Sequence, residues 1–233
     1  MVQYHLRCFA SIAEVRRRLK SPLALCVLIL TVGCTQQPNS REIPTPARSL
    51  DAPKLAAGIC RPGASANLPI PLKPQETLMW CWAASGEMVM AYLGKPVRQC
   101  IQANNLFSLK GVDCCTQPVA NGCVNGGWPE FQKYGVSYQK TSNLPLSWDQ
   151  LTDQLYCQKK PIAFSWGWID DIGQQNGGHM MVAVGYVPIN GTDFVTVNDP
   201  WPPGQGGDLA QTTYANYVSG PDHVHWDDFY DFK

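Results

Sequence analysis

Residues 75–94 read QETLMWCWAASGEMVMAYLG, and the interpretation of the whole chain depends on this stretch. Few residues between 81 and 93 oppose a helix, and Gly94 followed by Pro96 is a typical helix stop. Cys81 is therefore expected in the first helical turn, where backbone N–H groups and the helix dipole favour an anion. Thiolate is the reactive form of cysteine, and helix N-termini lower the pKa of a thiol. On this stretch alone, Cys81 is equally well a nucleophile or a small buried core residue.

A cysteine nucleophile needs a base, and His179 is the best placed of the four histidines. It lies in NGGHMMVAVGYV, where the apolar run Met180–Val187 predicts a buried strand. His179 is thus expected at the mouth of a strand, with its side chain able to enter a cleft. His223 and His225 alternate on the last predicted strand, where a surface strand is favoured over a metal-binding pair.

A third residue should orient the base, and two neighbouring residues are candidates. FVTVNDPW at 194–201 predicts the next strand, and the NG pair at 190–191 indicates a tight hairpin. With a two-residue turn, the face that carries His179 also carries even-numbered residues of this strand, which favours Asn198. A bulge or a longer loop would reverse the parity and favour Asp199.

The N-terminal region reads as an export signal. The basic stretch VRRRLK precedes the apolar run PLALCVLILTVGC, which is too short for a comfortable membrane span. The run ends at Cys34 in a pattern that resembles a bacterial lipoprotein signal, and that resemblance implies lipidation of Cys34; the alternative is ordinary secretion. We therefore expect a signal peptide at 1–33, a proline-rich flexible tether at 34–58, and a folded domain at 59–233.

The cysteine count separates one residue from the others. Ten cysteines are present, of which two lie in the signal segment and Cys34 is the lipidation candidate. Seven remain, and an odd cysteine in an oxidising compartment is an intermolecular partner or a free reactive thiol. Setting Cys81 aside leaves six residues, enough for three disulfides of undetermined connectivity: Cys60, Cys100, Cys114, Cys115, Cys123 and Cys157. A zinc site at 114–123 is the less favoured alternative, because no histidine lies nearby.

Composition excludes some functions. Hydrophobic residues make up 45% of the chain, enough for a sizeable core. From residue 34 onward, 13 Lys and Arg face 17 Asp and Glu, and the absence of a basic run argues against nucleic-acid binding. Trp80 and Trp82 are expected to pack the core rather than bind substrate. No cofactor and no metal are predicted, and a monomer is expected.

Several motifs together resemble the papain-like cysteine peptidases, especially a short bacterial branch with the pattern CWAA…CC…GGH…DPW. The match extends from about residue 70 to the C-terminus, and separate motifs agree in identity and order. These motifs are Q-x5-C-W at 75–82, DCC at 113–115, GCVNGGWPEFQKYGV at 122–136, GGH at 177–179 and DPW at 199–201.

This resemblance implies roles for individual residues. Cys81 would be the nucleophile, His179 the general base and then acid, and Gln75 an oxyanion donor. The bacterial branch has aspartate in its DP motif, so Asp199 is preferred as the orienting residue, with Asn198 as the alternative. Leu78 departs from the family, because the plant and animal enzymes carry a cysteine there. The implied fold is α+β and two-lobed, with a helical lobe around the Cys81 helix and a barrel-like antiparallel lobe.

The expected function is therefore hydrolysis of peptide bonds by a thiol peptidase that acts on peptide or protein substrates. It would be exported and lipid-anchored in a bacterial cell envelope, facing the periplasm or exterior, or otherwise secreted. Two alternatives share the sequence features. One is a cysteine acyltransferase or amidase acting on cell-wall or isopeptide bonds, and the other is a non-catalytic binding lipoprotein.

Overall fold

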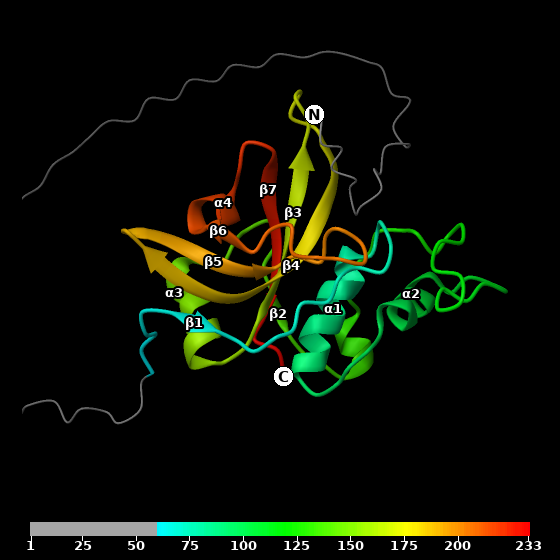
Figure 1. Ribbon diagram of the computed structural model, residues 1–233, viewed down its shortest axis with the longest axis horizontal. Coiled ribbons are helices and arrows are strands. Elements are labelled where there is room, and N and C mark those ends of the chain that lie inside the picture. Colours follow the sequence, from blue (N-terminus) through cyan, green and yellow to red (C-terminus); the bar gives the residue numbers. More distant parts are fainter. Residues whose placement is uncertain (1–59) are drawn as a thin grey trace, which may run out of the picture. The chain divides into compact units, whose positions relative to one another are not determined.

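The computed structural model describes residues 60–233, so the predicted signal peptide, the tether and Cys34 lie outside the described residues. An antiparallel sheet with strand order β2-β7-β3-β4-β5-β6 forms one part of this domain, and β1 pairs with β4 outside that path (Figure 1). The strands are β1 (Ala66–Asn67), β2 (Gln139–Lys140), β3 (Ile162–Ile169), β4 (Gln175–Ile189), β5 (Thr192–Asn198), β6 (Gln211–Thr213) and β7 (His223–Tyr230).

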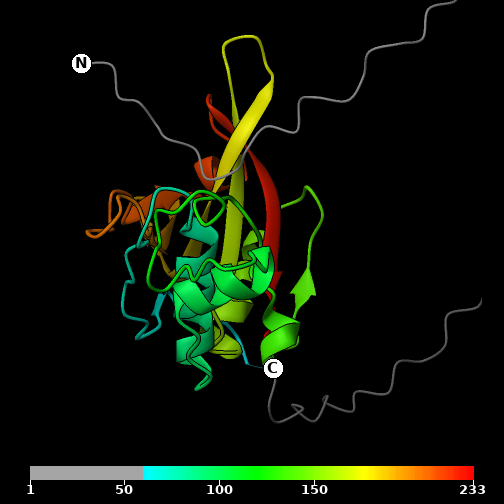
Figure 2. The same ribbon diagram turned by 90° about the vertical axis from the view of Figure 1, so that its right-hand side faces the viewer.

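Helices α1 and α2 lie on one side of this sheet, and α1 is the nearer of the two (Figures 1 and 2). The helices are α1 (Cys81–Tyr92), α2 (Gln99–Phe107), α3 (Trp148–Thr152) and α4 (Tyr214–Val218), with a 3-10 turn η1 (Phe131–Tyr134) and a π turn η2 (Asp153–Cys157). Ser147 starts α3 with a reciprocal capping box to Gln150. The predicted α+β class, with a helical part around Cys81 and an antiparallel sheet, is confirmed.

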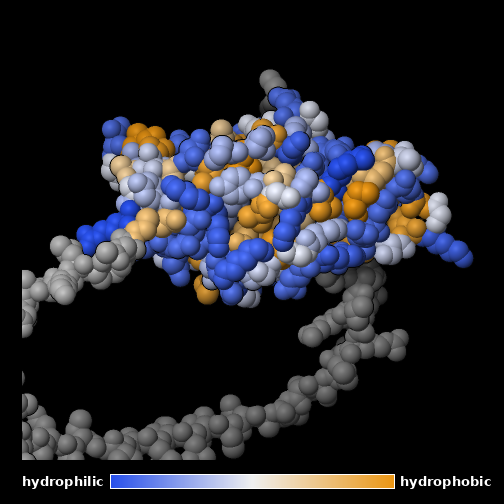
Figure 3. Space-filling model, turned by 90° about the horizontal axis from the view of Figure 1, so that it is seen from below, coloured by the Kyte–Doolittle hydropathy of each residue, from blue (hydrophilic) through white to orange (hydrophobic). Residues whose placement is uncertain are grey.

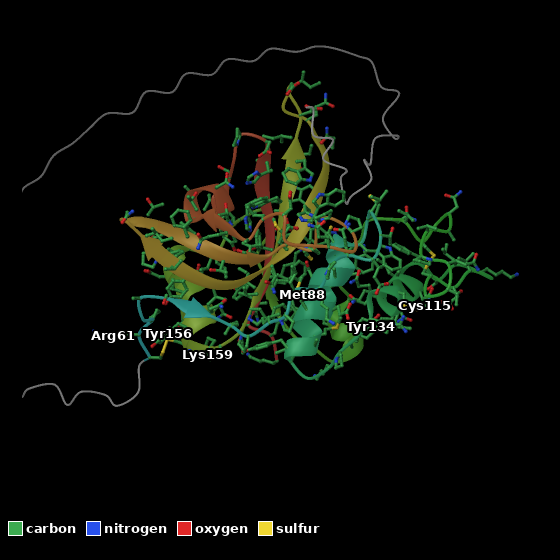
Figure 4. The ribbon with its side chains drawn as sticks, viewed as in Figure 1. Arg61, Met88, Cys115, Tyr134, Tyr156 and Lys159 are labelled. Atoms are coloured by element: carbon green, nitrogen blue, oxygen red, sulfur yellow. A yellow bond between two sulfur atoms is a disulfide. The ribbon has the colours of Figure 1, made fainter. Side chains whose placement is uncertain are left out.

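Helix α1 is buried on nearly all sides, which explains its continuous apolar sequence. Gly86 allows α2 to approach closely, because a Cβ atom there would lie 2.5 Å from Oε1 of Gln102. Met88 lies on the same helix within the core (Figure 4). Gly94, with a φ of 75°, follows the last turn, as predicted from its position before Pro96.

The hairpin between β4 and β5 forms at the predicted NG pair. Asn190 and Gly191 both have positive φ, 51° and 78°, as a type I′ turn requires. Strand β4 begins at Gln175, earlier than the predicted Met180, because the residues before His179 continue the pairing with β3 as far as Ile169.

Three disulfides join the six cysteines that were expected to pair. They are Cys60–Cys157, Cys100–Cys115 and Cys114–Cys123. The adjacent cysteines 114 and 115 therefore reach different partners. The Cys60–Cys157 bridge holds the start of the described chain against η2, near Arg61, Tyr156 and Lys159 in Figure 4. Disulfides of this number belong to an oxidising, extracytoplasmic environment.

The prediction that His223 and His225 lie on a surface strand is wrong. They share one face of β7, but both are buried, because α4 covers that face. His225 contacts the carboxylate of Asp228 through Nε2 at 3.0 Å, and Tyr217 of α4 donates its hydroxyl to the same oxygen at 2.5 Å. Burial, more than the neighbouring Asp228, raises the pKa of Tyr217 well above its ordinary value.

On the face seen in Figure 3, hydrophobic residues are interspersed with hydrophilic ones rather than gathered in one broad patch. Within residues 60–233, no helix is long and apolar enough to cross a membrane.

Candidate functional site

Cys81 is the first residue of α1 and is completely buried. The preceding residue, Trp80, is the N-cap and makes no side-chain cap hydrogen bond, while its carbonyl accepts from the N–H of Ala84 at 2.9 Å. The positive end of the helix dipole therefore lies at Cys81 without a carboxylate or hydroxyl cap beside it. This is the environment in which a thiolate is stabilised.

The side chains on either side of Cys81 are packing residues, as predicted. Trp80 and Trp82 are both completely buried. Each indole N–H donates to a backbone carbonyl of the disulfide-rich loop, Trp80 to Cys123 at 2.7 Å and Trp82 to Asn125 at 3.2 Å. Buried tryptophans that are satisfied in this way fix the start of the helix.

Nucleophilic chemistry at Cys81 requires the reduced sulfur, because the thiolate is the form that attacks a carbonyl carbon. The role of Cys81 as the reactive thiol stays a prediction.

His179 and Asp199 form a buried pair. Nε2 of the histidine lies 2.6 Å from Oδ1 of the aspartate, and both side chains are more than nine-tenths buried. The aspartate also accepts from the N–H of Trp201 at 2.9 Å and of Leu209 at 3.1 Å. With a neutral ring, Nε2–H donates to the carboxylate, which leaves Nδ1 as the nitrogen that accepts a proton.

A β-bulge explains why Asp199 and not Asn198 reaches the histidine. From the turn to the pair Gly185–Thr196, strands β4 and β5 follow the register that a two-residue turn dictates. The register then shifts by one between Ala183 and Gly185, so that Val182 pairs with Asn198. This extra residue reverses the parity and brings odd-numbered residues to the face of His179.

Asn198 has a different partner. Its side-chain amide donates to the carbonyl of Ile70 at 2.8 Å, which ties the end of β5 to the chain segment before Gln75. The residue therefore supports the framework around the site.

The nucleophile helix and the histidine strand are in direct contact. Ser85 lies one turn after Cys81 on the same face of α1, and its hydroxyl donates to the carbonyl of Met180 at 3.1 Å. Met180 directly follows His179. This contact places the start of α1 alongside the His179 region of β4.

Gln75 is joined to the loop that follows Asp199 through its main chain. Its N–H donates to the carbonyl of Pro200 and its carbonyl accepts from Gly204, both at 2.9 Å. The two hydrogen bonds fix Gln75 beside the histidine–aspartate pair, although the residues are far apart in sequence.

The side chain of Gln75 is completely buried and both of its amide hydrogens are used. Nε2 donates to the carbonyls of Thr77 at 2.8 Å and Leu78 at 3.0 Å. Oε1 has no hydrogen-bond partner within the described part of the chain. A role as oxyanion donor therefore requires one amide hydrogen to turn from a backbone carbonyl toward the substrate.

Sequence reasoning missed the aromatic surroundings of the histidine. Trp168 of β3 stacks near His179, with ring centroids 6.5 Å apart and planes at 16°. Trp201 follows Asp199 in the DPW motif and lies on the same loop. Its position in that motif was a signal, whereas Trp168 became recognisable only once the strand pairing was known.

A pocket of about 310 Å³ opens beside the pair. Its walls come from the sheet, α4 and the loop after β5. The lining residues are Trp166, Trp168, His179, Met181, Asp199, Trp201, Asp208, Leu209, Asn216, Pro221, Asp222 and His223.

One acidic side chain next to the site, Glu76, has a shifted pKa. Partial burial raises the pKa of its carboxyl, with a smaller contribution from Glu87 and an opposing one from Arg98.

Within residues 60–233, no three His, Cys, Asp or Glu side chains come together as a metal site.

The arrangement supports one kind of chemistry. A sulfur at a helix N-terminus lies beside a strand whose histidine is oriented by a buried carboxylate. Such a set can generate a thiolate, attack a carbonyl carbon and return a proton to a leaving group.

The comparison with known protein families points the same way. The sequence pattern of the Peptidase_C39 like family matches residues 67–223. No curated protein matches the chain. Solved structures similar to this one include xylellain, a cysteine protease from Xylella fastidiosa, with 12% identity over 73% of this chain and 87% of that chain and a TM-score of 0.44. Another is digestive procathepsin L 3 from Tenebrio molitor larval midgut, with 13% identity over 72% and 71% and a TM-score of 0.40.

Proposed function

The chain belongs to the Peptidase_C39 like family of cysteine peptidases, and from that premise we propose that it hydrolyses peptide bonds through an acyl-enzyme on Cys81. The observation that carries the proposal is the buried His179–Asp199 pair, in which Nε2 and Oδ1 lie 2.6 Å apart and His179 belongs to the strand that packs against the Cys81 helix. A carboxylate that fixes Nε2–H directs Nδ1 as the base.

The proposed reaction has two steps. In the first, Nδ1 of His179 holds the proton of Cys81, the thiolate attacks the scissile carbonyl carbon, and the C–N bond breaks as the imidazolium protonates the leaving amine. In the second, the same histidine removes a proton from water, which attacks the thioester and releases the acid. Backbone N–H of Cys81 and the redirected amide of Gln75 stabilise the oxyanion, each contributing roughly 3–4 kcal/mol.

The test begins with a reduced Cys81, because the thiolate is the attacking form of cysteine. The experiment titrates the purified domain with a mild reductant, adds an epoxide inhibitor of papain-like enzymes, and locates the label by mass spectrometry. We expect label on Cys81 while the three disulfides of the domain stay intact. Cys81→Ala should abolish the label and His179→Ala should slow it.

The result that contradicts the proposal is equally definite. Reduced Cys81 that remains unlabelled in the folded domain, although it alkylates with iodoacetamide after denaturation, would show that the residue is not an activated nucleophile. Asn198→Ala is the matched control, because Asn198 neighbours the pair but binds the Ile70 carbonyl instead.

We further propose that the protein is exported and lipid-anchored through Cys34. Support comes from the sequence of residues 1–34 and from the three disulfides, which form outside the cytoplasm. Radiolabelled palmitate fed to the expressing bacterium should enter the protein and should be absent from Cys34→Ala. Incorporation that survives this substitution would refute the anchor without affecting the peptidase proposal.

A further inference from the structure

The pocket beside His179 has a marked charge. Three of its lining side chains are carboxylates, Asp199, Asp208 and Asp222, and none of the described residues that line it is lysine or arginine. His179 and His223 are the basic groups in its wall, so the lining stays negative even when both are protonated. A pocket of this charge favours a cation.

The pocket also has aromatic walls. Trp166, Trp168 and Trp201 all contribute to its surface, and Trp166 stacks on the ring of His223 at 3.8 Å between centroids. Indole faces attract cations, Trp most strongly among the aromatic side chains. Aromatic walls beside carboxylates suit the long apolar stem and charged end of lysine or arginine.

The pocket lies on the histidine side of the site. All of its lining residues come from the sheet, α4 and the connecting loops, and none comes from the Cys81 helix. In the proposed reaction His179 gives its proton to the leaving amine. A pocket on the histidine side is therefore reached by residues that follow the scissile bond.

We propose that this pocket binds a lysine or arginine side chain of the substrate segment on the amine side of the scissile bond. The inference rests on the proposed peptidase function and adds a substrate preference to it. Asp208 is the principal specificity residue and is exposed at the pocket. The carboxylate of Asp199 is instead held by His179, and that of Asp222, which is also exposed, contacts His223 at 2.7 Å.

The first test compares quenched fluorescent peptides that differ only at the first two positions after the cleaved bond. Lysine should raise kcat/KM about fivefold over norleucine, a neutral residue of similar length, and glutamate should lower it. Asp208→Asn should reduce the lysine-to-norleucine ratio about threefold, because an exposed charge contributes modestly. Asp171→Asn, which removes an exposed carboxylate outside the pocket, should leave the ratio unchanged.

The second test measures binding without turnover. In the Cys81→Ala variant, the NMR signals of the Trp168 and Trp201 indole N–H groups should shift when lysyl-glycine amide is added. They should not shift when norleucyl-glycine amide is added. Asp208→Asn should weaken the shift.

The outcomes separate the two proposals. Cleavage of no peptide at all, with lysine-dependent shifts present, would overturn the peptidase proposal and leave the cation pocket. Cleavage with equal kcat/KM for lysine and norleucine, or indole signals that ignore lysine, would overturn the pocket.

Discussion

The two halves of the candidate site are held in different ways. The nucleophile side consists of α1, α2 and the irregular loop after α2, and two disulfides, Cys100–Cys115 and Cys114–Cys123, lie within it. The histidine side is the sheet. Main-chain pairing and buried polar contacts, such as that between Tyr217 and Asp228, stabilise this side. Disulfides stabilise the irregular loop of the nucleophile side, whereas hydrogen bonds stabilise the histidine side.

This difference has a direct consequence for the reactive residues. The disulfide loop contacts the Cys81 helix through the bond from the Trp80 indole to the Cys123 carbonyl. His179 and Asp199 instead depend on strand register. The nucleophile should therefore be sensitive to redox conditions and to loop substitutions, and the base to changes in the sheet.

The largest effect should come from the orienting carboxylate. Asp199→Ala should lower kcat/KM roughly 1000-fold, because His179 loses the group that fixes its tautomer. Asn198→Ala should lower kcat/KM only a few-fold, but should reduce the free energy of unfolding by about 1–2 kcal/mol, since the Ile70 carbonyl loses its donor. Peptide hydrolysis and urea unfolding measure the two. Equal losses of activity in the two variants would show that strand register does not decide which residue orients His179.

The second prediction concerns the two disulfides of the nucleophile side. Replacing both cysteines of Cys114–Cys123 by alanine should lower the free energy of unfolding by about 2–4 kcal/mol. It should also lower turnover, because the disulfide fixes the loop whose Cys123 carbonyl accepts from the Trp80 indole N–H. The matched replacement of Cys100 and Cys115 should cost a similar amount and leave turnover of the folded protein nearly unchanged. Guanidinium unfolding and active-site titration distinguish the variants, and identical turnover in both would contradict the proposed link.

The third prediction tests the hydrogen-bonded half. Tyr217→Phe removes the hydroxyl that donates to buried Asp228 and should lower stability by about 1–2 kcal/mol at neutral pH. Because folding raises the pKa of Tyr217, the wild type should lose stability as pH rises above the ordinary value of 10.0, and the difference from Tyr217→Phe should shrink there. Urea unfolding at pH 8 and above pH 10 provides the check; a difference that grows instead would refute this reading.

The smallest effect should come from Glu76. Its folded-state pKa is raised mainly by partial burial, so the folded protein binds its proton more tightly than the unfolded chain. The wild type should therefore gain stability relative to Glu76→Gln as pH falls from 7 through the carboxyl range. Because the side chain is largely exposed, the change should stay below about 0.5 kcal/mol. Thermal unfolding of both proteins at pH 4 and 7 measures it, and the opposite sign would contradict the assigned cause.

Local signals in the sequence predicted much of this structure. Gly94 and Pro96 marked the end of the Cys81 helix, and Asn190-Gly191 marked the hairpin. Each of these features depends on a few adjacent residues and their backbone preferences.

Other features depend on contacts between distant segments, and the sequence could not supply them. Disulfide connectivity and the burial of His225 beneath α4 both belong to this kind. The donors of Gln75 are a further case, since only the folded loop shows that Thr77 and Leu78 occupy them.

The register shift between Ala183 and Gly185 means that the chemistry of the proposed triad is encoded partly by counting residues. Losing this shift at unchanged chain length would restore the plain hairpin frame and turn Asn198 toward His179, exchanging a carboxylate for an amide without any substitution in the NDP segment. Gain or loss of a bulge in this strand is thus a route by which related enzymes could interconvert Asp-type and Asn-type sites. Alignments across this family should therefore take strand register into account as well as residue identity.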